Sequence, residues 1–233
     1  FKRYQMQRVW RGERPQAGRL REFYQCDIDI IGKGELPLMA DTEIPQVISS
    51  IFSELLTTPF TIKVNNRKVL NQFFSSLAVD ATATMRTLDK LGKIGSEGVS
   101  AELAAAGVPE SAIQKILDFA QITGTNDEIL AQLDAMNLDT AELRAVASDL
   151  VQIDLSIARG LDYYTGTVYE TALLDNPQFG SVCSGGRYDD LVKRFTGQEV
   201  PATGVSIGVD RLLAALRAKG QISQSADGPV VVT

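Results

Sequence analysis

Apolar and polar residues alternate in segments at both ends of this chain, whereas residues 80–150 between them have the spacing of amphipathic helices. Residues 21–31, REFYQCDIDII, alternate with a period of two, and residues 153–170 are strand-like on both sides of a tight loop. The middle block is rich in alanine and contains successive helix starts. This distribution predicts a mixed fold in which a small helical insertion interrupts a strand-rich core.

The alternation divides residues 21–31 into two faces. One face carries an aromatic ring, an amide and two carboxylates: Phe23, Gln25, Asp27 and Asp29. The other is predicted to face the core: Tyr24, Cys26, Ile28 and Ile30. Exposure of an edge strand is the simpler interpretation of the polar face. The alternative is a pocket in which arginines hold phosphate and carboxylates hold a cationic or hydrogen-bond-donating group. Arginine is available, since the first 21 residues contain seven basic side chains and one acid.

Composition restricts the chemistry of any site. At 233 residues and 44% hydrophobic, the chain can bury one core, or one core and a small satellite. The net charge of −6 argues against a general nucleic-acid coat or a membrane-surface protein, and no apolar run approaches a membrane span. Cys26 and Cys183 are too few for a disulfide framework, which suits a reducing cytoplasm. The sequence has no histidine, so chemistry must rest on arginine, carboxylates, tyrosine, backbone amides or a bound ion.

Further elements follow from local patterns. Helices are predicted around residues 43–53 and 69–77, with a strand at 60–64 and a turn at 65–66. Ser184-Gly185-Gly186 predicts a turn or a close backbone approach, and residues 187–190 are predicted to open a helix that buries Leu191, Val192 and Phe195. Residues 201–208 predict a strand with three small residues on one face, which leaves room for a flat ligand: Gly204, Ser206 and Gly208. Arg211 then lies in the first turn of a helix, where the macrodipole disfavours a cation, so a phosphate contact is one reason for its presence.

Four stretches together resemble the catalytic domain of histidyl-tRNA synthetases, which are class II aminoacyl-tRNA synthetases. They are RGERPQAGRLREFYQ at residues 11–25 (motif 2), RGLDYYTGTVYE at 159–170, SVCSGGRYDDL at 181–191 and GVSIGVDRL at 204–212 (motif 3). The resemblance implies an α+β fold, a class II synthetase-like antiparallel sheet flanked by helices. It also implies a division into core (1–78), helical insertion (79–150), core (151–226) and the stub of a further domain (227–233). Motif 1 of the family would precede residue 1, so we expect the chain to be a piece of a longer protein.

The resemblance also implies roles for individual residues. The predicted ATP-binding residues are Arg11, Glu13, Arg19, Phe23 and Arg211. The predicted histidine-binding residues are Gln25, Asp29, Arg159, Tyr163, Tyr164 and Tyr188. Arg159, Arg11 and Arg211 would stabilise charge at the reacting phosphate, with Mg²⁺ on the pyrophosphate end. Two positions depart from the family pattern: Asp29 stands where a glutamate is common, and Ser206 where class II enzymes generally have a glycine.

The implied activity is that of a histidine–tRNA ligase, with histidine, ATP and tRNA(His) as partners, in a cytoplasmic homodimer without membrane attachment. Two alternatives stay open. One is a non-catalytic regulatory subunit of an ATP phosphoribosyltransferase, although such paralogues lose the arginine stretch that is intact here. The other is an inactive fragment of the synthetase.

Overall fold

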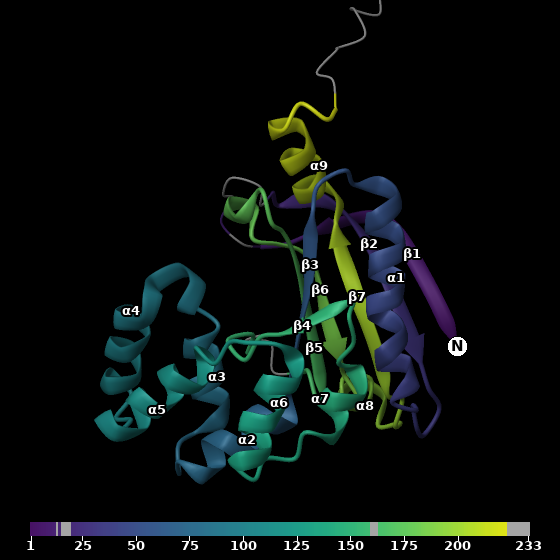
Figure 1. Cartoon of the computed structure of the whole chain (residues 1–233). Coiled ribbons are helices and arrows are strands. Elements are labelled where there is room, and N and C mark those ends of the chain that lie inside the picture. Colours follow the sequence, from purple (N-terminus) through teal and green to yellow (C-terminus); the bar gives the residue numbers. More distant parts are fainter. Residues whose placement is uncertain (13, 15–19, 159–162, 223–233) are drawn as a thin grey trace, which may run out of the picture.

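A seven-stranded sheet organises the molecule, and its computed structural model describes residues 1–12, 14, 20–158 and 163–222 (Figure 1). The strands are β1 (Lys2–Trp10), β2 (Glu22–Ile31), β3 (Phe60–Asn66), β4 (Val151–Ile153), β5 (Thr167–Leu173), β6 (Ser181–Arg187) and β7 (Ala202–Gly208). Their order is β1-β2-β7-β6-β5-β3-β4, and neighbours are antiparallel except for the parallel pair β3 and β4. The predicted antiparallel sheet flanked by helices is therefore confirmed.

Helices pack on one face of the sheet and beside the β3–β4 edge (Figure 1). The helices are α1 (Met39–Leu55), α2 (Arg67–Ser76), α3 (Ala81–Leu88), α4 (Leu91–Ala105), α5 (Glu110–Ala120), α6 (Asn126–Ala135), α7 (Ala141–Val146), α8 (Lys193–Thr196) and α9 (Val209–Ala218), with a 3₁₀ turn at Pro177–Phe179. Helix α1 runs along the sheet, whereas α2 to α7 gather beside β3 and β4 (Figure 1). Within the described residues, no helix combines the length and apolar character needed to cross a membrane.

Helix α1 shows how the sequence sets its contact with the sheet. Ile44, Ile48 and Phe52 recur at helical spacing and are buried, whereas Leu55 at the end of the helix is 62% exposed. Pro45 lies inside the helix and has no N–H, so the carbonyl of Asp41 lacks its usual helical donor. The hydroxyl of Tyr169 on β5 donates to that carbonyl at 2.7 Å instead, which ties the helix to the sheet.

One continuous core extends from the sheet into the helical block. The ring of Phe73 on α2 stacks on that of Phe119 on α5 with centroids 4.0 Å apart, and both side chains are buried. A small satellite cluster of Ile157, Tyr164 and Val168 lies apart from this core. Of the two expected arrangements, the structure shows one core with a small satellite, and Tyr163 and Tyr188 pack against that satellite.

Two local predictions need correction, and a third loses one of its two alternatives. Residues 65 and 66 continue β3, and the side chain of Asn66 then caps α2 by accepting from the N–H of Lys68 at 2.8 Å. Ser184, Gly185 and Gly186 lie within β6 and form no turn. The helix predicted to begin at residue 187 is reduced to the four residues of α8, because Arg187 still belongs to β6 and residues 188–192 form an irregular segment. Phe195, which was expected to be buried, is 82% exposed.

Candidate functional site

Two neighbouring cavities open on the sheet face that carries Phe23, Gln25, Asp27 and Asp29. The larger cavity, of about 370 Å³, is lined by strands β1, β2, β6 and β7 and by the segment before β5. Five predicted histidine-binding residues line it: Gln25, Asp29, Tyr163, Tyr164 and Tyr188. The smaller cavity, of about 100 Å³, is lined by three predicted ATP-binding residues: Arg11, Phe23 and Arg211. The predicted Glu13, Arg19 and Arg159 lie outside the described residues.

Gln25 lies at the junction of the two cavities and lines both, as do Ser184 and Ser206. Its side-chain nitrogen donates to Asp27 Oδ1 at 2.9 Å and to the hydroxyl of Ser206. Its side-chain oxygen accepts from Arg11 Nη2 at 3.2 Å. These bonds fix the orientation of the Gln25 amide. They also give Ser206, which stands at the motif 3 position that differs from the class pattern, a polar partner on the neighbouring strand β2.

Asp29 lies on β2 and lines the larger cavity. It is paired directly with Arg3 on β1 and with Gly204 on β7. The hydroxyl of Tyr188 donates to Asp29 Oδ1. Burial, followed by that hydrogen bond and the nearby negative charge, raises the pKa of Tyr188 well above its usual value, so the phenol stays protonated and keeps donating.

The two adjacent tyrosines extend the wall beside Tyr188. The hydroxyls of Tyr163 and Tyr164 lie 3.3 Å apart, and the ring of Tyr163 meets that of Tyr188 edge to face at 6.3 Å. A Cβ on Gly186 would lie 2.9 Å from Cδ1 of Tyr164, so only glycine lets this ring pack against β6. The Gly-Gly pair therefore provides a close backbone approach, which was one of its two predicted uses.

The smaller cavity has a cationic wall. The guanidinium carbon of Arg11 lies 4.9 Å from the centroid of the Phe23 ring. Arg211 lies in the first turn of α9, and its Nη1 donates to the carbonyl of Ser181 at 2.5 Å. The N–H of Tyr24 donates to Asp210 Oδ2 at 2.5 Å, which fixes the start of α9 against β2. The hydrogen bond to the Ser181 carbonyl therefore explains the position of Arg211 at a helix start without a phosphate. Arg11 and Arg211 nevertheless line the same cavity.

A family model described as histidyl-tRNA synthetase matches residues 3–212, which is nearly the whole chain. The chain belongs to the histidyl-tRNA synthetase family. A protein of Clostridium tetani strain Massachusetts / E88 named histidine–tRNA ligase is 47% identical over 243 residues, which cover 97% of this chain and 55% of the relative. The chain thus spans about half the length of the curated relatives it matches.

Solved structures agree with this family. The histidyl-tRNA synthetase of Nostoc sp. PCC 7120 superposes with a TM-score of 0.87 at 41% identity, over 96% of this chain and 56% of that one. A Bacillus halodurans C protein described as an ATP phosphoribosyltransferase regulatory subunit/histidyl-tRNA synthetase reaches 0.69 at 21% identity, over 92% of this chain and 58% of that one. At that identity the second likeness concerns the fold alone.

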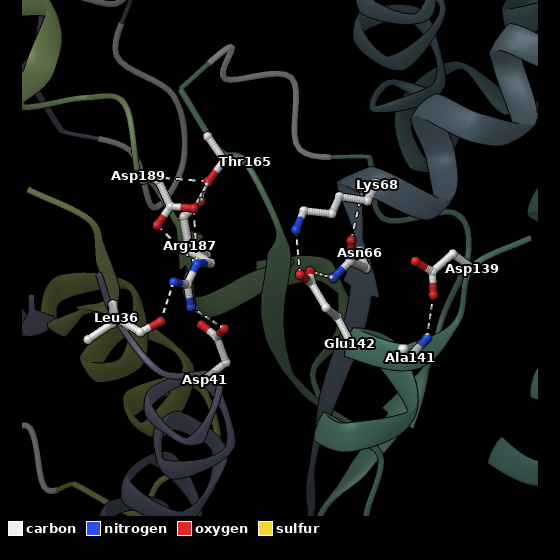
Figure 2. A network of polar contacts seen from close by, with 10 residues as sticks. All are labelled: Leu36, Asp41, Asn66, Lys68, Asp139, Ala141, Glu142, Thr165, Arg187 and Asp189. Atoms are coloured by element: carbon white, nitrogen blue, oxygen red, sulfur yellow. Dashed lines mark hydrogen bonds and ion pairs between the residues drawn. The ribbon is translucent and has the colours of Figure 1, made fainter. Parts of the chain in front are cut away.

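In this synthetase-family chain, a largely buried network of ion pairs and hydrogen bonds is centred on Arg187 (Figure 2). Its Nη1 donates to Asp41 Oδ2 at 2.9 Å and its Nη2 to the carbonyl of Leu36 at 2.6 Å. Its Nε donates to Asp189 Oδ2 at 3.0 Å, and the same oxygen accepts from the hydroxyl of Thr165 at 2.9 Å. Arg187 and Asp189 flank Tyr188 and Thr165 follows Tyr164, so the network positions the backbone that carries both phenols.

Asp41 is fully buried in this network. Burial raises the pKa of Asp41, and the charge of Arg187 opposes that rise. The ion pair with Arg187 therefore reduces the free-energy cost of burying Asp41 in its ionised form.

A second network joins the helical block to the core (Figure 2). Glu142 on α7 forms an ion pair with Lys68 on α2, and its Oε2 accepts from Asn66 Nδ2 at 3.1 Å. The N–H of Arg67 donates to the carbonyl of Gly166 at 2.9 Å, and its Nη1 to the carbonyl of Ala158 at 3.3 Å. Ala158 and Gly166, which lie on either side of residues 159–162 in the sequence, are thus hydrogen-bonded to Arg67 at the N-terminus of α2. The same helix forms the ion pair with α7.

In the part of the chain that the structure describes, no group of three or more histidine, cysteine or acidic side chains is arranged to hold a metal ion.

Sequence reasoning missed three residues that line the cavities: Arg3, Gln5 and Ser184. Asp27 was predicted only as one of the pocket carboxylates, and Ser206 only as one of the small residues that leave room for a ligand. Arg3 was counted only within the basic N-terminal block. Its position became clear only from the register of β1 against β2, which pairs it with Asp29.

Proposed function

We propose that this chain is the catalytic core of a histidine–tRNA ligase. It would activate histidine with ATP to histidyl-adenylate and then pass the histidyl group to the 3′ end of tRNA(His). The observation that carries this proposal is the pair of adjoining cavities, one lined by Asp29 with phenols and the other by arginines with Phe23, which share Gln25. Such an arrangement suits an amino acid whose carboxylate must meet a nucleotide phosphate.

The larger cavity would bind histidine through its imidazole. Asp29 would accept the ring N–H, the hydroxyl of Tyr164 would donate to the other ring nitrogen, and Tyr163 and Tyr188 would complete the wall. A side chain of similar size without a ring N–H would leave the carboxylate and the phenol unpaired, which disfavours it strongly. Gln25, held by Asp27, Ser206 and Arg11, would contact the polar backbone groups of the amino acid.

The smaller cavity would bind the adenine and phosphates of ATP. Phe23 would stack on adenine, and Arg11 and Arg211 would hold phosphate oxygens from two sides. By resemblance, Glu13 and Arg19 would bind the nucleotide further, and Arg159 would contact the α-phosphate and the histidine carboxylate. Mg²⁺ would enter with the triphosphate and neutralise part of its charge.

The activation step needs no general base. A carboxylate oxygen of histidine attacks the α-phosphorus, a P–O bond forms, and the bond to pyrophosphate breaks with its electron pair. The main obstacle is repulsion between anions and the negative charge that develops on the phosphate. Fixed guanidinium groups lower that barrier, and the removal of one such donor costs about 2.7–4 kcal/mol, or a factor of about 100–1000 in rate.

Further parts of the proposal concern the whole protein. We propose that it acts as a homodimer in the cytoplasm, and the low cysteine count, Cys26 and Cys183 only, suits that compartment. We also propose the division into core (1–78 and 151–226), helical insertion (79–150) and a stub (227–233). The grouping of α3 to α7 beside the β3–β4 edge supports the placement of the insertion (Figure 1).

The test is ATP–pyrophosphate exchange with histidine, in the protein extended to the full length of its relatives. We expect histidine-dependent exchange in the wild type, and a loss of about 100- to 1000-fold in Arg159→Ala with ATP affinity nearly unchanged. Arg8→Ala is the control, because it also removes one arginine, but Arg8 pairs with Glu22 and Tyr24 outside both cavities.

Undiminished exchange in Arg159→Ala would remove that residue from the mechanism. A folded wild type that binds histidine without exchange would instead support the regulatory subunit. If only the 233-residue chain lacked exchange, it would be an inactive piece of an active enzyme.

A further inference from the structure

Arg3 lies beside the carboxylate that is proposed to recognise histidine. It is the direct cross-strand partner of Asp29, and its Nε lies 3.7 Å from Asp29 Oδ2. Its Nη2 donates to the side-chain oxygen of Gln5, two residues along the same face of β1. Arg3 and Gln5 both line the larger cavity. One oxygen of Asp29 thus faces Tyr188, and the other faces a guanidinium.

The charged and titratable groups around Asp29 come from three places. They are Arg3 from β1, Asp27 from β2, and the phenols Tyr163, Tyr164 and Tyr188 from the segments that flank β5 and β6. Strand β7 contributes only uncharged residues, Gly204, Val205 and Ser206. Among the described residues that line the larger cavity, Arg3 is therefore the only one with a positive charge.

The charge beside Asp29 determines which form of an imidazole the cavity favours. A carboxylate alone stabilises a cation next to it, so it would favour imidazolium over neutral imidazole. A guanidinium within 4 Å of the same carboxylate opposes a second cation there. Neutral imidazole also matches the hydrogen-bonding groups, because one ring nitrogen donates to Asp29 and the other accepts from the hydroxyl of Tyr164.

We propose that Arg3 is a specificity-determining residue that restricts the larger cavity to neutral imidazole and disfavours cationic side chains. This inference deepens the proposed function and rests on it. Arg3 offsets the charge of Asp29 without taking the carboxylate out of reach, since its Nε is beyond ordinary hydrogen-bond distance from Oδ2. Asp29 keeps its acceptor capacity for the ring N–H.

The experiment measures the KM for histidine by ATP–pyrophosphate exchange at pH 7.5 and pH 5.5, in the full-length protein. The side chain of histidine titrates near pH 6.5, so the neutral fraction falls about tenfold over this range. We expect the KM of the wild type to rise about tenfold at the lower pH. In Arg3→Leu that rise should shrink to about twofold or less, whereas Arg3→Lys, which keeps the charge, should retain it.

Arg8→Leu is the matched control. Arg8 lies on the same strand but on the opposite face, so its removal changes the net charge equally and should leave the tenfold rise intact. The KM for ATP, measured at both pH values, separates this effect from a general loss at low pH. The side chain of Arg3 is 37% exposed and its ion pair is loose, so Arg3→Leu is expected to fold. Arg3→Gln provides a second neutral variant.

A rise in Arg3→Leu and Arg3→Gln as large as in the wild type would overturn the inference and leave the proposed function intact. So would a wild-type KM that does not change with pH. An absence of histidine-dependent exchange in the wild type would contradict the proposed function, and this inference with it.

Discussion

Gly204 on β7 leaves no room for a side chain beside Asp29 on β2. A Cβ at position 204 would lie 2.4 Å from Asp29 Oδ1 and 2.4 Å from the carbonyl oxygen of Ile28. Either the carboxylate or the paired strands would have to move. The position of the proposed imidazole acceptor therefore depends on a glycine in the neighbouring strand.

Gly204→Ala is expected to remove histidine binding and to destabilise the fold by about 1–3 kcal/mol through overpacking. Calorimetry with histidine and urea unfolding measure the two effects. Gly92→Ala in α4 is the control, because a Cβ there meets nothing within 4 Å. That change should leave histidine binding intact and alter stability by no more than about 1 kcal/mol. Equal behaviour of the two variants would contradict the steric explanation.

Asp29→Asn tests the carboxylate itself with almost no change in volume. It replaces a charged acceptor by an amide, and a hydrogen bond to a charged group contributes about 1.5–3 kcal/mol. We expect the affinity for histidine to fall about 10- to 100-fold and that for ATP to stay within about twofold. Similar losses for both ligands would mean that Asp29 maintains the fold rather than reading the imidazole.

Arg187→Met should be among the most destabilising changes in the chain. It would leave the fully buried Asp41 without its cation, and breaking a buried ion pair in this way costs about 3–5 kcal/mol. Urea unfolding gives the value. Adding Asp41→Leu to Arg187→Met should recover part of the loss, because the unpaired charge is then gone.

Lys193→Met, which removes an exposed ion pair with Glu199, should change stability little. A similarly small effect of Arg187→Met would show that water or another group compensates the negative charge of Asp41.

Alternation along one strand was enough to predict which side chains share a face. Phe23, Gln25, Asp27 and Asp29 were assigned together from a period of two, and they line the two cavities. The opposite face was less predictable, because Tyr24 was expected in the core and is 46% exposed. Alternation identifies two faces, but it does not say what covers them at each position.

Contacts between distant strands could not be read from local patterns. Gly185 and Gly186 predicted either a turn or a close backbone approach, and local sequence could not decide between them. The close approach is to the adjacent strand, where a Cβ on Gly185 would lie 2.0 Å from the carbonyl oxygen of Gly204. The same limit applied to Arg187, whose partners Asp41 and Leu36 are about 150 residues away. The likeness to a family supplied roles that the residues alone left open.

Asp154, between β4 and β5, gives a prediction for stability against pH. Burial alone would raise the pKa of Asp154, but hydrogen bonds from Lys63 and Ser156 outweigh it and hold the pKa below the usual 3.8. The folded state then binds fewer protons than the unfolded state near that pH. The bonds therefore stabilise the fold above pH 3.8, and this contribution is lost as the pH falls through the folded pKa.

Asp154→Asn should accordingly be less stable than the wild type at pH 7, with a gap that narrows as the pH falls below about 4. Lys63→Met should behave in the same way, because the Nζ of Lys63 donates to Asp154 Oδ2 at 2.7 Å and supplies the charge that favours the ionised form. Urea unfolding at pH 7, 5, 4 and 3 measures the gap. A gap that stayed constant over this range would show that Asp154 stabilises the fold through its shape and neutral hydrogen bonds, not through its charge.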